Sequence, residues 1–153
     1  MAGRPLVLFV CTHNAARSQM AEGYLRARYG QIADVASAGT ELRPVHPLAV
    51  AVMAEIGIDI SHQVPKRVEE FFNHHPAIVI TVCDASCQAY PFVPGAGIIL
   101  HAAYLDPIAC NGSPEECREI FRMVRDGIAS WIDYFLVPQY IRKLLQSPLE
   151  RGY

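Results

Sequence analysis

Residues 6–28 read LVLFVCTHNAARSQMAEGYLRAR, and this stretch decides the fold. An unbroken apolar run from Leu6 to Val10 is typical of a strand buried in a parallel sheet. The run ends on Cys11, and helical spacing of apolar residues begins only at Met20. The sequence therefore predicts a buried strand, a tight turn and a helix, with a cysteine where the strand ends.

The turn has the pattern C-x5-R-S, which suits nucleophilic attack on a tetrahedral oxyanion. A cysteine that faces a helix N-terminus lies in positive potential, which favours the thiolate. Backbone N–H groups of a tight loop entering a helix point inward and can hold an anion. Arg17 can close the loop with a two-pronged contact, Ser18 can donate a hydrogen bond to the thiolate, and Asn14 suits a left-handed turn. A buried structural cysteine followed by a solvated arginine is the alternative interpretation.

The stretch FVCTHNAARSQMAEG resembles the signature of the low-molecular-weight protein tyrosine phosphatase superfamily. Within it, the continuation R-S-Q-M-A-E is similar to that of thioredoxin-coupled arsenate reductases. The resemblance implies a four-stranded parallel sheet of order 2-1-3-4 flanked by helices. It also implies an oxyanion-binding loop, whose members here are Thr12, His13, Asn14, Ala15, Ala16 and Arg17.

The rest of the chain alternates strands and helices in a way that agrees with this fold. We expect further strands at residues 33–37, 77–82 and 97–103, and a short amphipathic helix at 66–72. Ser113-Pro114-Glu115-Glu116 is a helix start with a cap, and a long helix follows it. The face predicted to be buried in this helix carries Phe121, Val124, Ile128, Ile132 and Phe135. We expect a single catalytic domain over residues 1–136 and a C-terminal extension over 137–153, which packs back on the core or mediates dimerisation.

Composition limits the possible partners and location. With 153 residues, 52% hydrophobic content and a net charge of −2, the chain has no basic surface of the kind that binds nucleic acid. Nothing in the sequence approaches a membrane span. Five cysteines without a secretory signal indicate reduced thiols in the cytoplasm.

Asp106 is the candidate general acid. It lies in Leu105-Asp106-Pro107 after the expected fourth strand, where the resemblance places an acid that protonates the leaving oxygen. Asp-Pro is also a common way to begin a turn, so a purely structural role is the alternative. The phosphatases that the chain resembles commonly carry tyrosines just after this Asp-Pro to hold an aryl phosphate. Residues 108–112 contain no aromatic residue, which favours a small inorganic anion.

Cys83 and Cys87 separate a reductase from a phosphatase. A phosphatase needs one cysteine, whereas a reductase that uses thiols needs successive exchanges. The resemblance implies that Cys83 attacks Cys11 and that Cys87 then attacks Cys83. Two buried inert thiols, or a zinc site, are the alternatives, and Cys110 and Cys117 compete for the third role. A zinc site would use Cys83, Cys87, Cys110 and Cys117.

The resemblance thus implies a cytoplasmic arsenate reductase that binds arsenate, with phosphate or sulfate as competing anions, and takes electrons from a thioredoxin-like protein. No cofactor or metal is expected, and the sequence leaves the oligomeric state open. Some members bind potassium beside the loop; Asn14, Glu22 and Ser37 match that site, but Lys66 stands where an Asp is usual. A tyrosine phosphatase that uses Cys11, Arg17 and Asp106 is the alternative enzyme. A non-catalytic oxyanion or redox sensor is the third hypothesis.

Overall fold

A computed structural model describes residues 3–83 and 93–146. Its centre is a parallel sheet of four strands in the order β2-β1-β3-β4, as predicted. The strands are β1 (Leu6–Cys11), β2 (Asp34–Gly39), β3 (Ile78–Thr81) and β4 (Ile98–His101). β1 lies between β2 and β3, and this order puts its carboxyl end at the point where such sheets bind ligands.

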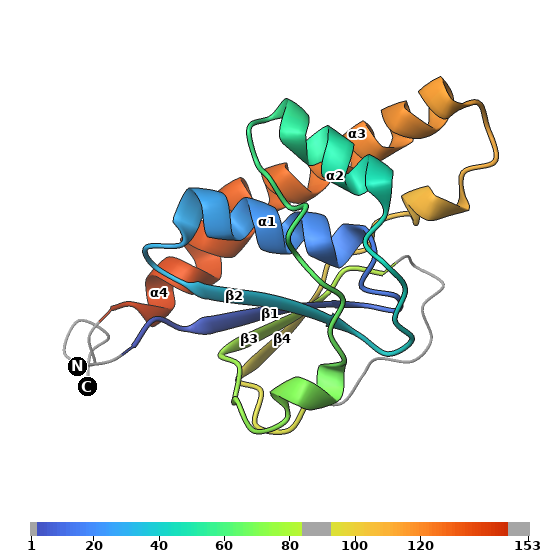
Figure 1. The fold of residues 1–153 in the computed structure, drawn as a ribbon. Helices are drawn as coiled ribbons and strands as arrows, with labels where there is room; N and C mark the ends of the chain where they lie inside the picture. The colour runs from blue at the N-terminus through green and yellow to red at the C-terminus, as the bar shows by residue number, and fades with distance from the viewer. Residues whose placement is uncertain (1–2, 84–92, 147–153) are drawn as a thin grey trace.

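The helices lie mainly on one side of the sheet, as Figure 1 shows. They are α1 (Arg17–Tyr29), α2 (Pro47–Glu55), α3 (Pro114–Trp131) and the short α4 (Arg142–Leu144). Most of the buried apolar side chains lie between these helices and the sheet. The opposite face has a smaller cluster, which includes Leu8, Val10 and Val79 and is covered by a 3-10 turn, η1 (Val68–Phe71). The helix predicted at 66–72 is therefore wrong in extent. Only residues 68–71 are helical, and these four residues are enough to cover the smaller face.

The last helix differs from the prediction at its end. α3 continues without a break into a π-helix, η3 (Ile132–Ile141), which contains Pro138. Proline has no N–H to donate to the preceding turn, so a wider turn replaces the regular ladder here. The widening shifts the buried face: Leu136 is fully buried, whereas Phe135, which was expected in the core, is 39% exposed. Val137 and Ile141 are also buried against the same core, so the helix packs on the domain beyond residue 136.

Two tyrosines of α1 tie η3 to the body of the protein. Tyr24 and Tyr29 donate hydrogen bonds of 2.7 Å to the two carboxylate oxygens of Asp133. The hydrogen bond to Asp133 is the main reason that the pKa of Tyr29 is raised, to about 12. The carboxylate thus joins the two helices through both of its oxygens.

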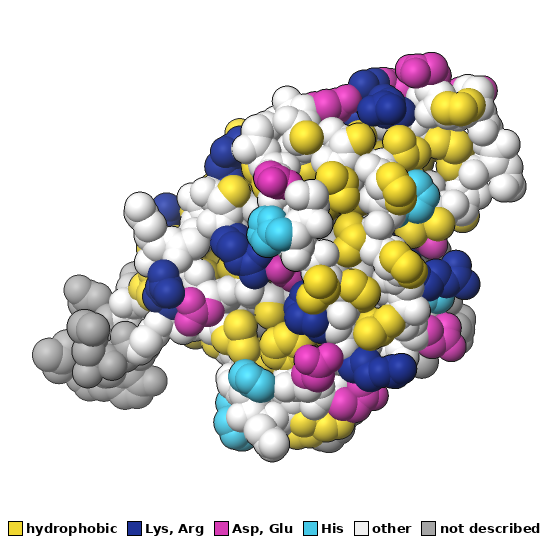
Figure 2. Space-filling view, in the orientation of Figure 1, with side chains coloured by type: hydrophobic (Ala, Val, Ile, Leu, Met, Phe, Trp, Pro, Cys, Tyr) yellow, Lys and Arg dark blue, Asp and Glu magenta, His cyan; other side chains and the backbone are white. Residues whose placement is uncertain are grey.

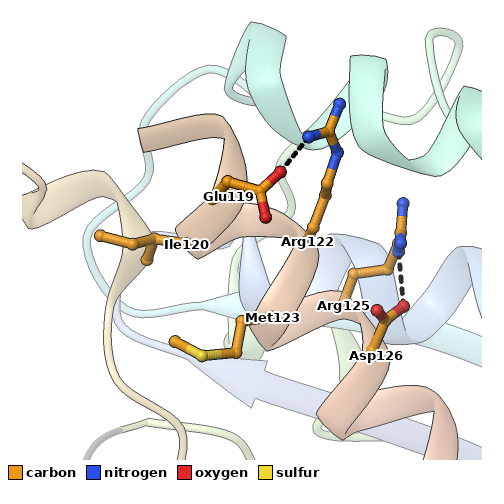
Figure 3. A pocket seen from close by; sticks show the side chains of 6 residues that line it. All are labelled: Glu119, Ile120, Arg122, Met123, Arg125 and Asp126. Atoms are coloured by element: carbon orange, nitrogen blue, oxygen red, sulfur yellow. Dashed lines mark hydrogen bonds and ion pairs between the residues drawn. The ribbon is translucent and has the colours of Figure 1, made fainter. Parts of the chain in front are cut away.

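An ionic cluster joins α2 to α3. Glu55 at the end of α2 accepts from Arg122 at 2.7 Å and from Arg125 at 2.8 Å. Figure 3 shows both arginines pointing the same way from α3, each paired with an acidic neighbour on its own helix, Glu119 or Asp126. Figure 2 shows that charges of both signs are interspersed over the visible face. No helix among residues 3–83 and 93–146 is long and apolar enough to cross a membrane.

The Glu55 cluster predicts a specific dependence of stability on pH. Hydrogen bonds from Arg122, and then from Arg125, lower the pKa of Glu55 to about 2 against the opposing effect of desolvation. An unfolded glutamate has a pKa of about 4.3, so this contribution is complete above that value and is lost as the pH falls toward 2. Glu55→Gln should therefore lower stability at neutral pH and flatten its decline between pH 4.5 and 2. Urea unfolding at a series of pH values tests this, with the exposed Glu69→Gln as control; identical curves for Glu55→Gln and wild type would contradict it.

Candidate active site

The backbone carbonyl groups of the loop between β1 and α1 point outward and accept hydrogen bonds from amides of residues 40–46. The carbonyl of Thr12 accepts from the amides of Thr40 and Glu41 at 2.9 and 2.8 Å, and that of His13 from Arg43 at 3.1 Å. The carbonyl of Ala15 likewise accepts from the amide of residue 46 at 2.9 Å. In a trans peptide the C=O and the following N–H point in opposite directions. The outward carbonyls therefore turn the amides of residues 13, 14 and 16 toward the centre of the loop, where an anion would bind.

Asn14 is the residue that shapes this loop. It has a positive φ of 51° and is fully buried. Its Nδ2 donates to the hydroxyls of Ser18 and Ser37, both at 2.8 Å. Its Oδ1 accepts from Gln19 Nε2 at 3.0 Å and from the amide of Lys66 at 2.9 Å. Every donor and acceptor of the side chain is thus used.

Cys11, the predicted nucleophile, is buried and has a hydrogen-bonding partner. Cys11 Sγ lies 2.8 Å from Ser18 Oγ. Because Ser18 Oγ already accepts from Asn14, its own hydrogen is free to point at the sulfur, which is the arrangement that stabilises a thiolate. The sequence prediction for Ser18 thus agrees with its position, and its catalytic role stays a prediction.

Arg17 and Asp106 meet at the opening of the loop. Arg17 is 5% exposed, and its Nη2 lies 3.8 Å from Asp106 Oδ2. Its Nη1 donates to the carbonyl of Tyr104 at 3.0 Å, a contact that sequence analysis did not anticipate. Asp106 also begins a 3-10 turn, η2 (Pro107–Ala109), in which its Oδ1 accepts from the Ile108 amide at 3.1 Å. The acid and turn interpretations of Asp106 are therefore compatible.

His13 and His46 have structural partners. The ring of His13 donates through Nδ1 to the carbonyl of Glu41 at 2.7 Å, so its side chain holds the loop from outside. His46 caps α2, because its Nδ1 accepts from the amide of Leu48 at 3.1 Å, and its ring stacks on Phe121. Burial lowers the pKa of His46, against a smaller opposing effect of Asp106. A neutral His46 keeps the cap acceptor, which protonation would remove.

Glu22 is a buried carboxylate that is linked to Asn14 of the loop through Ser37. It accepts from Ser37 at 2.6 Å, and Arg26 and Lys66 lie 2.8 and 3.3 Å from its oxygens. The ammonium of Lys66 therefore supplies positive charge beside Glu22. Since this charge is already provided by the chain, the residues present do not fit a bound potassium ion.

The cysteines fall into two groups. Cys11 and Cys83 are buried and take no part in the Cys110–Cys117 disulfide. Cys83 lies two residues beyond the end of β3, and its carbonyl accepts from the Tyr104 amide at 3.1 Å. Val10 pairs with Thr81, so Cys11 and Cys83 follow directly on neighbouring strands at the same edge of the sheet.

Cys110 and Cys117 form a disulfide, which corrects the expectation that all five cysteines are reduced thiols. The two positions are seven apart in the sequence, and their pairing was not predicted from it. Cys87 lies outside the described residues. Among residues 3–83 and 93–146 no group of three or more His, Cys, Asp or Glu side chains is placed to hold a metal, and two of the four candidate zinc ligands are used by the disulfide.

Comparison with known proteins agrees with this geometry. The family model for low molecular weight phosphotyrosine protein phosphatase matches residues 6–143. The chain belongs to this family. An arsenate reductase of Halalkalibacterium halodurans is 38% identical over 132 residues, which is 86% of this chain and 95% of that protein.

Two solved structures add detail. An arsenate reductase in the phosphate-binding state has a TM-score of 0.70 and 32% identity, over 84% of this chain and 94% of its own. A thioredoxin-dependent arsenate reductase of Corynebacterium glutamicum has a TM-score of 0.61 and 29% identity, over 86% of this chain and 62% of its own. The family and fold predicted from the Cys11 loop are therefore confirmed.

Gly39 gives a direct test of the loop's geometry. A Cβ at this position would lie 2.8 Å from the Thr12 carbonyl oxygen and 3.0 Å from the backbone of Asn14. Gly39→Ala should therefore displace the loop and lower the rate of reaction at Cys11 by about tenfold or more, because small misplacements of reacting groups are costly. Iodoacetamide modification and oxyanion binding measure the effect. Gly3→Ala, where nothing lies within 4 Å, is the control, and equal reactivity of the two variants would contradict the account.

Proposed function

We propose that this protein is an arsenate reductase that uses a cysteine relay and a thioredoxin-like electron donor. The observation that carries the proposal is that two buried cysteines, Cys11 and Cys83, lie at the carboxyl ends of neighbouring strands. One thiol beside an anion loop is sufficient for a phosphatase. A second buried thiol beside the first is what a two-electron reduction requires.

The first step forms a bond between Cys11 sulfur and arsenic. Arsenate would be held by the inward loop amides and by Arg17, and Cys11 attacks as the thiolate. An oxygen of arsenate leaves as water after Asp106 supplies a proton. The contact between Arg17 and Asp106 brings the positive clamp and the acid to the same side of the loop.

The second step reduces arsenic. Cys83 attacks the sulfur of Cys11, and the electron pair of the sulfur–arsenic bond stays on arsenic. Arsenic thereby passes from the pentavalent to the trivalent state and leaves as arsenite, while Cys11 and Cys83 form a disulfide. Cys87 then attacks Cys83, which frees Cys11 and leaves a Cys83–Cys87 disulfide for the donor to reduce.

Three further points support the proposal. The Halalkalibacterium relative is named an arsenate reductase, and the Corynebacterium structure is named thioredoxin-dependent. A similar reductase binds phosphate, so phosphate or sulfate should compete at this loop. Cys110 and Cys117 are bonded to each other, which favours Cys87 over either of them as the third thiol of the relay. Regeneration by a dithiol protein suits a reducing compartment, and we place the reaction in the cytoplasm.

A coupled assay tests the function against its alternatives. With thioredoxin, thioredoxin reductase and NADPH, we expect arsenite release to continue over many turnovers and to stop when the donor is omitted. Hydrolysis of an aryl phosphate, measured in parallel, should be much slower than arsenate reduction. Faster ester hydrolysis with no arsenite would identify a phosphatase, and binding of oxyanions without either reaction would identify a sensor.

The order of the thiols gives a second prediction. Cys87→Ser should release one equivalent of arsenite per chain and then stall as a Cys11–Cys83 disulfide, because the third thiol acts after arsenite has left. Cys83→Ser should release none. Arsenite analysis and peptide mapping after a single turnover measure both, and a bridge from Cys83 to Cys110 or Cys117 would overturn the assignment of Cys87.

A further inference from the structure

The Cys110–Cys117 disulfide has no part in the relay described above. Its Cα atoms are 5.6 Å apart, and both residues are half-buried at the surface. In a reducing compartment, disulfides of ordinary proteins are usually transient and take part in catalysis or redox sensing. We therefore expect the Cys110–Cys117 disulfide to have a role beyond stability.

One end of the disulfide is directly connected to Asp106. The backbone carbonyl of Asp106 accepts from the Ala109 amide at 3.2 Å, and that of Pro107 accepts from the Cys110 amide at 3.3 Å. With the Ile108 amide bonded to the Asp106 carboxylate, residues 106–110 form one hydrogen-bonded coil. Cys110 ends this coil, and the disulfide joins it to the first turn of α3.

The other end of the same segment is also attached to α3. The hydroxyl of Tyr104 donates to the carbonyl of Gly127 at 3.1 Å, and the carbonyl of Tyr104 accepts from Arg17. Segment 104–110 is thus fixed to α3 at both ends, by a hydrogen bond at Tyr104 and by a covalent bond at Cys110. Asp106 lies between these two attachments, with its carboxylate 3.8 Å from Arg17.

We propose that Cys110 and Cys117 form a redox-sensitive site that positions Asp106: the disulfide holds the acid against the anion loop, and its reduction loosens it. The inference rests on the proposed function only in treating Asp106 as the acid. Both cysteines are proposed to act through Asp106, so both are positioning residues.

The redox step needs a dithiol protein of the class that also serves the relay. A donor thiolate attacks Cys110 sulfur, the sulfur–sulfur bond breaks, and Cys117 leaves as the thiolate in the first turn of α3, where the helix N-terminus favours negative charge. The second donor thiol then attacks the mixed disulfide. Two electrons and two protons pass to Cys110 and Cys117, and the donor becomes a disulfide.

The test compares the parent protein, with its Cys110–Cys117 disulfide verified by peptide mapping, with the double variant Cys110→Ser/Cys117→Ser. Each is also prepared with Asp106→Asn. First-turnover arsenite release without donor is the kinetic measurement. We expect the double variant to be about tenfold slower when Asp106 is present and unchanged in the Asp106→Asn background, since the effect acts through the position of the acid. Equal rates in the parent and the double variant, or an equal loss in both backgrounds, would overturn the proposal.

Two measurements do not depend on arsenate chemistry. Hydrogen exchange of the amides of residues 108–110 should quicken when the disulfide is reduced or removed, and unchanged exchange would overturn the proposal. Incubation with thioredoxin, its reductase and NADPH should make both cysteines available for alkylation, and a pair that stays oxidised would refute the redox part. If the parent releases no arsenite but exchange responds to reduction, the proposed function fails while the coupling of the disulfide to the Asp106 segment stands.

Discussion

The active site depends on a single amide side chain, that of Asn14. Its two donors and its acceptor oxygen join the loop, α1, β2 and the segment at Lys66 into one network. The side chain is fully buried, so each partner would lose a hydrogen bond without gaining water if it were removed, at about 1–3 kcal/mol for each group left unsatisfied. The left-handed backbone at this position sets the curvature of the loop. The direction of the Ser18 hydroxyl toward Cys11 follows from the same network.

Charge in this network is balanced within the chain. The hydroxyl of Ser37 accepts a hydrogen bond from Asn14 and donates one to Glu22. Arg26 and Lys66 neutralise the Glu22 carboxylate. A buried carboxylate without such partners would be strongly destabilising. Because Arg26 and Lys66 already balance Glu22, Arg17 is not needed for that role and lies beside Asp106 at the loop.

The features that were predictable from sequence are local ones. The strand, loop and helix from Leu6 to Tyr29 follow one another directly, and their apolar spacing and the C-x5-R-S pattern predicted both their structure and the family. The sheet order followed from the alternation of strands and helices together with the family resemblance.

The features that were missed depend on contacts between distant segments. The carbonyl of Tyr104 holds Arg17 across 87 positions of sequence, and a backbone acceptor leaves no trace in the residue type. Leu136 occupies the core position that was predicted for Phe135. The helix widens into a π-helix here, and the wider turn changes the direction of the side chains that follow. The Cys110–Cys117 bond depends on how η2 meets α3, which spacing alone does not determine.

The central claim is that Cys11 begins a two-electron reduction and not a hydrolysis. The most direct measurement is the number of thiols lost per arsenite released when the protein reacts once with arsenate without any donor. The account predicts that two thiols disappear for each arsenite, because the electrons come from the chain itself. Consumption of arsenate or an ester with no loss of thiols would contradict it.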